Sequence, residues 1–228
     1  MDSQAEGSVQ EDNNTQQTDN GYEPPSELSG AHSLKQAYIN EKAAPELLQY
    51  AQELVDSTQK GITEQEALLD EWEGDREKDL AAGIIRFELQ RVRYILRGYL
   101  RTRLRKLEQY VMALLDDPQA LTRLSSQEAA YAREFFRLFG RHMKSALLDH
   151  LPENFTSMAK QSSASPDKDM VDRPDLEAHV FCRVLDDVGE VATDDNAETS
   201  VYFRKGDQYV VSYKWIRQLL ADNSVILV

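Results

Sequence analysis

The chain has 228 residues, a formal net charge of −14 and a composition that is 41% hydrophobic and 8% aromatic, enough for a folded core in one large or two small domains. A single cysteine, Cys182, excludes an intrachain disulfide framework and favours a reducing compartment. The sequence contains no secretory signal and no apolar run near the ~20 residues that cross a bilayer, so we expect a soluble intracellular protein with no membrane contact.

Residues 1–26 consist mainly of Gln, Asn, Ser, Asp and Glu, with almost no side chains that could be buried. Such a segment cannot offset the entropy that it would lose on ordering, so the sequence predicts a disordered acidic tail. The tail is either a passive solvated segment or a tether or phosphorylation platform, and the sequence leaves both alternatives open.

Apolar residues recur with a helical period over residues 27–152, which predicts a bundle of four or five helices. Pro45 suits the first turn of the second helix, because its missing N–H costs little there. Gly61 is expected to separate that helix from another that begins at about residue 63.

The longest predicted helix covers about residues 80–115, with Asp79 as its cap. The sequence "SSQE" at 125–128 has the spacing of a capping box and predicts the start of a further helix, which Pro152 ends.

Residues 153–173 are polar and predict a flexible linker, since about 20 residues is long for a loop inside one compact domain. Residues 174–228 predict strands at "EAHVFCRVL", "VYFRKGD", "QYVVSY" and "SVILV", and a short helix at "KWIRQLLADN". The second and third of these strands are expected to form a hairpin across Lys205-Gly206-Asp207. The predicted fold class is therefore mainly α: an N-terminal helical bundle followed by a small β-rich α+β domain, which is marginal alone and should pack on something else.

Residues 86–110 contain eight basic side chains and two acidic ones, although the chain as a whole is acidic. On a helical wheel most of the apolar residues form one stripe, Arg103 lies within that stripe, and Phe87 and Tyr94 lie opposite it. A helix with apolar side chains on several sides is expected to be covered by its own bundle and by another chain. A buried guanidinium needs a hydrogen-bonded carboxylate, so we interpret the arginines as internal struts or subunit contacts. Contact with a DNA backbone through residues 86–105 and a plain solvated face are the alternatives.

Motifs of catalysis and cofactor binding are absent from the sequence. There is no Gly-rich phosphate loop, and no GxGxxG after a strand. His142 and His150 miss the four-residue spacing of a helical metal pair, and there is no second cysteine to bind zinc. We expect no catalytic site, no metal and no cofactor.

Several segments, in this order, resemble the SLD-five type of GINS subunit: "AYINEKAAPELL" (37–48), "RVRYILRGYLRTRLRKLE" (91–108), "AYAREFF" (130–136), "HLP" (150–152), "RPDLEAHVFCRV" (173–184) and "SYKWIRQLLADNSVILV" (212–228). The resemblance implies a helical A domain and a β-rich B domain. It also implies a nuclear, non-catalytic scaffold in a heterotetramer with the three PSF proteins. The expected further partners are the MCM helicase ring and its RecJ-like accessory factor in the replicative helicase, and contact with DNA is expected to be indirect.

The matching positions supply the candidate site residues. Those implied as subunit contacts or struts are Arg91, Arg93, Tyr94, Tyr99, Arg101 and Arg103. Those implied at a helix junction are Asn40, Glu41, Pro45 and Glu46.

Overall fold

The computed structural model describes residues 26–152, 158, 171–193 and 200–228. The tail predicted over residues 1–26 lies outside the described residues except for Ser26, which begins the first helix. The linker predicted over residues 153–173 also lies outside them, except for Met158 and residues 171–173.

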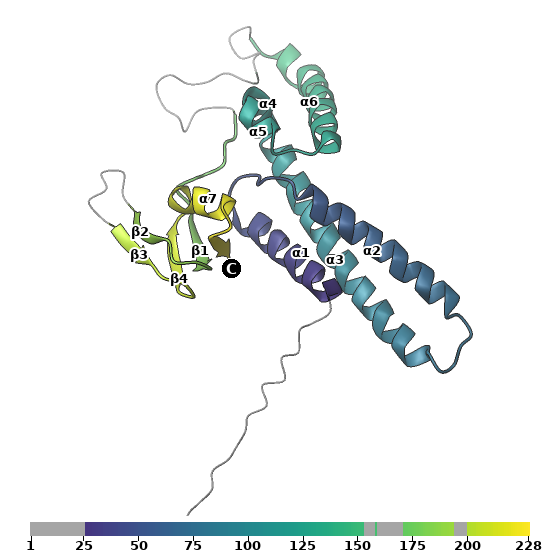
Figure 1. Ribbon diagram of the computed structural model, residues 1–228. Helices are drawn as coiled ribbons and strands as arrows, with labels where there is room; N and C mark the ends of the chain where they lie inside the picture. Colours follow the sequence, from purple (N-terminus) through teal and green to yellow (C-terminus); the bar gives the residue numbers. More distant parts are fainter. Residues whose placement is uncertain (1–25, 153–157, 159–170, 194–199) are drawn as a thin grey trace, which may run out of the picture.

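Three helices form the body of the bundle: α1 (Ser26–Ala43), α2 (Gln52–Glu71) and α3 (Asp79–Gln109). Both α1 and α2 lie along α3 (Figure 1). Their shared core contains Leu34 of α1, Val55 of α2 and three residues of α3, Ile95, Leu96 and Tyr99, whose spacing places them on one side of that helix. The close contact between α1 and α3 depends on Gly98, because a Cβ there would lie 2.9 Å from the ring of Tyr38.

The predicted second helix is wrong in its start. Pro45 lies in a non-helical connector between α1 and α2, and Gly61 lies inside α2 rather than at a break. A proline disfavours helical backbone angles at the residue before it, so a helix does not run readily through Pro45. In addition, side chains of other elements donate hydrogen bonds to the carbonyls of the connector, which holds it in a non-helical conformation. Gly61 costs only about 1 kcal/mol in a helix interior, which the packing of α2 on α3 offsets.

The long predicted helix ends earlier than expected, at Gln109, and a separate helix α4 (Val111–Asp116) follows. Asp79 lies in the first turn of α3, and Lys78 occupies the cap position. The short helix α5 (Pro118–Leu121) leads to α6 (Ser126–Ala146) and a 3₁₀ turn, η1 (Leu148–His150). The predicted capping box is confirmed, with the Ser125 side chain bonded to the Glu128 amide and the Glu128 side chain to the Ser125 amide.

The C-terminal part contains β1 (His179–Val184), β2 (Gly189–Ala192), β3 (Ser200–Phe203), β4 (Gln208–Ser212), α7 (Tyr213–Ala221) and β5 (Val225–Leu227). β1 is the centre of an antiparallel sheet of order β4-β1-β5, and β2 pairs with β3. The predicted hairpin is therefore wrong, since its two strands belong to different sheets. The turn between them bonds to Val184 at the end of β1, so it extends the β1–β4 ladder. The predicted α7 and β5 are confirmed.

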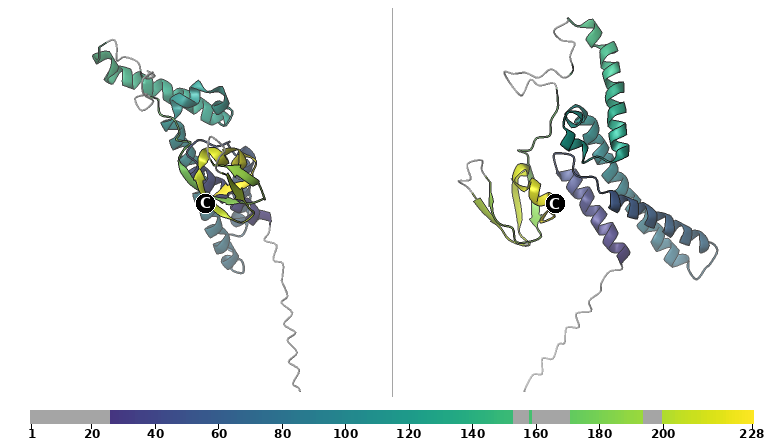
Figure 2. Two further views of the ribbon diagram at one scale, coloured as in Figure 1. Left: turned by 90° about the vertical axis from the view of Figure 1, so that its left-hand side faces the viewer. Right: turned by 45° about the horizontal axis from the view of Figure 1, so that its top comes forward.

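This small domain packs against α1, as Figures 1 and 2 both show. Its core joins Ala44 at the end of α1 to Val184, Phe203, Ile216 and Val225. The Asn40 side-chain oxygen accepts a hydrogen bond from the Leu227 amide at 2.9 Å, so β5 is bonded directly to the bundle. The fold class predicted from the sequence, a helical bundle followed by a small β-rich domain, is confirmed.

Candidate functional site

Seven charged side chains and one tyrosine, from six parts of the chain, meet where α1, α3, α6 and α7 approach one another. We call this cluster the ionic junction; its members are Glu41, Glu46, Arg103, Lys106, Arg123, Glu128, Tyr213 and Arg217. Its members come from α1, the connector, α3, the α5–α6 loop, α6 and α7, so it joins the helical bundle to the small C-terminal domain.

Arg103 is the centre of the junction and is 0% exposed. Its Nε and Nη2 atoms donate to the two carboxylate oxygens of Glu128 at 2.8 and 2.9 Å, and Nη1 donates to Glu41 at 3.0 Å. The same guanidinium donates to two backbone carbonyls, those of Leu48 and Arg123. Burial alone lowers the pKa of Arg103, but these carboxylates raise it overall, so the side chain is charged.

Glu41 is buried and is shared between Arg103 and Lys106. The Lys106 ammonium lies 3.0 Å from the Glu41 carboxylate and also donates to the backbone carbonyls of Glu41 and Glu46. Burial lowers the pKa of Lys106 below its ordinary value, although Glu41 acts in the opposite direction. Lys106 therefore bonds the end of α1 and the connector to α3 and does not lie on a solvated surface.

Glu46 joins the bundle to the small domain. Its carboxylate accepts hydrogen bonds from Arg217 at 2.5 and 2.7 Å, from Arg123 at 2.6 Å and from the Tyr213 hydroxyl at 3.0 Å. Burial by itself raises the pKa of Glu46, but the bonds from Arg217 and Arg123 outweigh it and the pKa lies below its ordinary value. Burial and the same carboxylate raise the pKa of Tyr213, so its hydroxyl stays a donor.

The four residues predicted at a helix junction are all found near this cluster. Glu41 and Glu46 are two of its carboxylates, Asn40 bonds β5, and Pro45 lies in the connector between them. The sequence did not single out Lys106, Arg123, Tyr213 or Arg217, and it identified Glu128 only through its capping box. No local pattern marks Lys106, Arg123, Tyr213 and Arg217, because the bonding partners of these side chains in the junction are 60 to 171 positions away.

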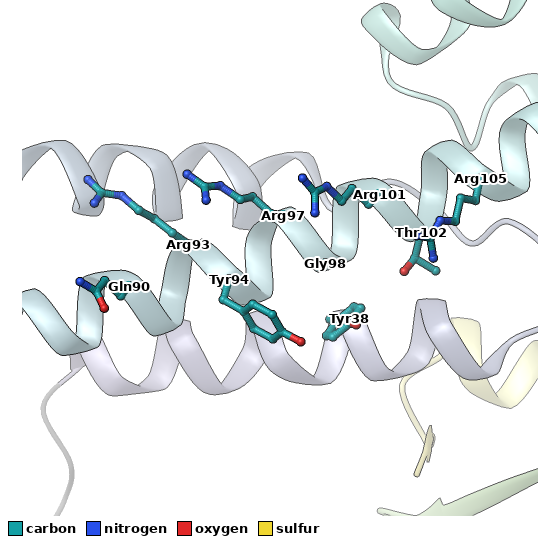
Figure 3. A pocket seen from close by; sticks show the side chains of 9 residues that line it. All are labelled: Tyr38, Gln90, Arg93, Tyr94, Arg97, Gly98, Arg101, Thr102 and Arg105. Carbon is teal, nitrogen blue, oxygen red and sulfur yellow. The ribbon is translucent and has the colours of Figure 1, made fainter.

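A second basic feature is the exposed face of α3, where arginines recur every fourth residue. We call it the arginine groove: Arg93, Arg97, Arg101 and Arg105, with Tyr38 and Tyr94 beside them, around an open space of about 580 Å³ (Figure 3). Arg93 is paired with Glu66 of α2. No residue in the described part of the chain forms a hydrogen bond or ion pair with the other three.

The six arginines and tyrosines predicted as contacts or struts therefore lie in three different environments. Arg103 and Tyr99 are buried, and the Tyr99 hydroxyl accepts a hydrogen bond from the Ala51 amide at 3.2 Å. Arg93, Tyr94 and Arg101 line the arginine groove. Arg91 is exposed and bonds Glu88, three residues earlier on its own helix.

Large apolar side chains are also exposed on two helices. On α3 they are Leu80, Ile84, Phe87, Tyr94 and Leu104, and on α6 they are Tyr131, Phe136 and Leu138. Phe87 is 76% exposed and Tyr94 is 70% exposed. α6 extends away from the rest of the bundle (Figure 1) and, of its side chains, buries only Ala132. Unpartnered apolar faces of this kind mark protein interaction surfaces.

Over the described ranges, no group of three or more His, Cys, Asp or Glu side chains is arranged to hold a metal ion. In the same part of the chain, no helix is both long and apolar enough to span a bilayer.

Two sequence families match the chain: residues 49–147 match the GINS complex protein helical bundle domain, and residues 174–228 match the DNA replication complex GINS protein SLD5 C-terminus. The DNA replication complex GINS protein SLD5 of Arabidopsis thaliana is 33% identical over 208 residues, covering 91% of this chain and 94% of the relative. The protein of the same name from Homo sapiens is 32% identical over 204 residues, covering 86% and 87%. That from Dictyostelium discoideum is 29% identical, covering 89% and 93%. The chain therefore belongs to the SLD5 family of DNA replication complex GINS proteins.

Proposed function

We propose that this chain is a non-catalytic structural subunit of the nuclear GINS heterotetramer, assembled with the three PSF proteins. In that role it braces the MCM helicase ring and its RecJ-like accessory factor in the replicative helicase during initiation and elongation. It contacts DNA indirectly. Family membership supports the shared complex, and the exposed surfaces of this chain support the assembly role.

The observation that carries this proposal is the pair of unpartnered apolar faces on α3 and α6. A folded single chain gains nothing from leaving Phe87, Tyr94 and Leu138 at least half exposed. Contact with sister subunits would remove these side chains from water, at about 25 cal/mol per Å² of apolar area buried. An obligate interface of this kind buries roughly 2,000 Å² or more.

The test is co-expression of the full chain with the three PSF proteins of its own source. The expected result is a complex with one copy of each subunit, while the chain expressed alone aggregates or is unstable. A cooperatively folded monomer at micromolar concentration that co-purifies with none of the three would contradict the proposal.

A second candidate function is a helical module that contacts a DNA backbone through the arginine row of residues 86–105. It is favoured by one observation: within the described residues, the guanidinium groups of Arg97, Arg101 and Arg105 have no partner. Binding of this kind would weaken steeply with salt, with a log–log slope of about −0.7 per phosphate contact for a single strand. This candidate is tested by measuring the affinity of the full chain for a single-stranded oligonucleotide at two salt concentrations. Absent or salt-insensitive binding would contradict the DNA-binding function and leave assembly as the proposed function.

A further inference from the structure

We infer that the arginine groove docks an acidic α-helix of a sister GINS subunit, one that presents carboxylates at four-residue intervals. The inference rests on the proposed function, since it assigns a partner to one of the surfaces that assembly would cover. Its basis is the spacing of the arginines, the one pair already formed in the groove, and the side chains that surround it.

The spacing fits a helix. Residues four apart on an α-helix share a face and are separated by about 6 Å along the axis. Arg93, Arg97, Arg101 and Arg105 therefore form a ladder about 18 Å long on one side of α3, as Figure 3 shows for their side chains. A partner helix lying alongside with Asp or Glu at the same interval would present one carboxylate to each guanidinium. Arginine suits this arrangement because its planar fork pairs with a carboxylate through two bonds.

The first position of the ladder already shows this chemistry within the chain. Glu66 of α2, a helix lying alongside α3, pairs with Arg93. The described residues supply no equivalent carboxylate to Arg97, Arg101 or Arg105. A second acidic helix would thus continue the pairing that α2 begins.

The surroundings of the ladder indicate a protein helix rather than nucleic acid. Phe87 and Tyr94 are largely exposed beside the arginines, and Leu104 lies among them at 37% exposure. Aromatic residues and arginine are enriched at the centres of protein interfaces, whereas lysine is depleted, and α3 contains no lysine before Lys106.

The experiment replaces the three unpaired arginines together, as Arg97→Gln/Arg101→Gln/Arg105→Gln, in the full chain co-expressed with the three PSF proteins. An exposed ion pair contributes at most about a factor of five in affinity, so loss of three pairs predicts an association of one sister subunit that is weaker by up to about 100-fold. In a complex that retains the three arginines, a photo-crosslinking amino acid at position 94 should attach to a helix of that subunit, and this helix should contain repeated Asp or Glu residues. Replacing those acidic residues by amides should weaken association as the arginine variant does, with little additional loss when the two are combined.

Arg91→Gln is the matched control, because Arg91 is an exposed arginine of the same helix that already pairs with Glu88. It should assemble like the parent chain. The inference is overturned if the triple variant assembles with unchanged affinity and salt dependence, or if it loses binding to a single-stranded oligonucleotide while assembly is intact. Both results leave the proposed function standing, because the parent complex has formed; failure of the parent chain to assemble would instead contradict the proposed function.

Discussion

Arg103→Ala is the substitution with the largest effect expected from the ionic junction. It removes both bonds to Glu128, the bond to Glu41 and the donors of two backbone carbonyls. Glu41 keeps Lys106, but the Glu128 carboxylate loses its only cationic partner in the described part of the chain. Breaking a buried ion pair from one side typically costs about 3–5 kcal/mol, because the remaining charge stays in a poorly solvated site.

Hydrogen–deuterium exchange of the assembled complex measures this loss locally, which avoids the need for a stable isolated chain. A cost of about 3–5 kcal/mol lowers the protection of backbone amides that open together with the junction by about 100- to 5,000-fold. The affected peptides should cover the end of α1, the second half of α3 and the start of α6, which the junction joins. Peptides from the first half of α3 should change much less.

Two comparisons make this result specific to the buried charge. Arg91→Ala removes an exposed arginine from the same helix and should change protection by less than about 0.5 kcal/mol equivalent. Arg103→Met/Glu128→Gln removes both charges and keeps a residue that can complete the capping box, so it should recover much of the lost protection. If Arg103→Ala and Arg91→Ala behave alike, the reasoning about the junction is refuted.

Three further predictions follow from the other features. Because the pKa of Glu46 is lowered in the folded chain, the ionised carboxylate contributes its full stabilisation above the ordinary glutamate pKa of about 4.3. That contribution is lost as the pH falls through the lowered pKa. The difference in thermal unfolding temperature between the parent complex and the Glu46→Gln complex should therefore shrink over that pH range. Ser125→Ala removes the α6 cap and should lower the stability of that helix end by about 1 kcal/mol. The measurement is hydrogen exchange at the Glu128 amide, which should become faster; an unchanged rate would mean that the cap does not stabilise the helix. Phe136→Asp/Leu138→Asp should abolish co-purification of sister subunits without reducing helical circular dichroism, and intact assembly would remove α6 from the interface.

The helical period and the cap residues were sufficient to predict most of the elements, because both act over a few neighbouring residues. The capping box at Ser125, the helix at 213–221 and the terminal strand all depend on such local chemistry. The start of the second helix and the β3–β4 hairpin were wrong for the opposite reason. In both cases the backbone bonds to distant elements, the connector carbonyls to Arg103, Lys106 and Arg123, and the turn before β4 to Val184.

Composition and helical periodicity are enough to predict an acidic helical bundle with a small β-rich domain and arginines concentrated in one helix. Which of those arginines are buried and which are exposed depends on how the folded chain packs around that helix. Arg101 and Arg103 are two positions apart, yet one lines the groove and the other is the centre of the junction, since a helix turns about 200° between them. The oppositely charged partners of these buried groups come from positions up to 171 residues away, as for Arg217 and Glu46, and only the packed chain brings them together.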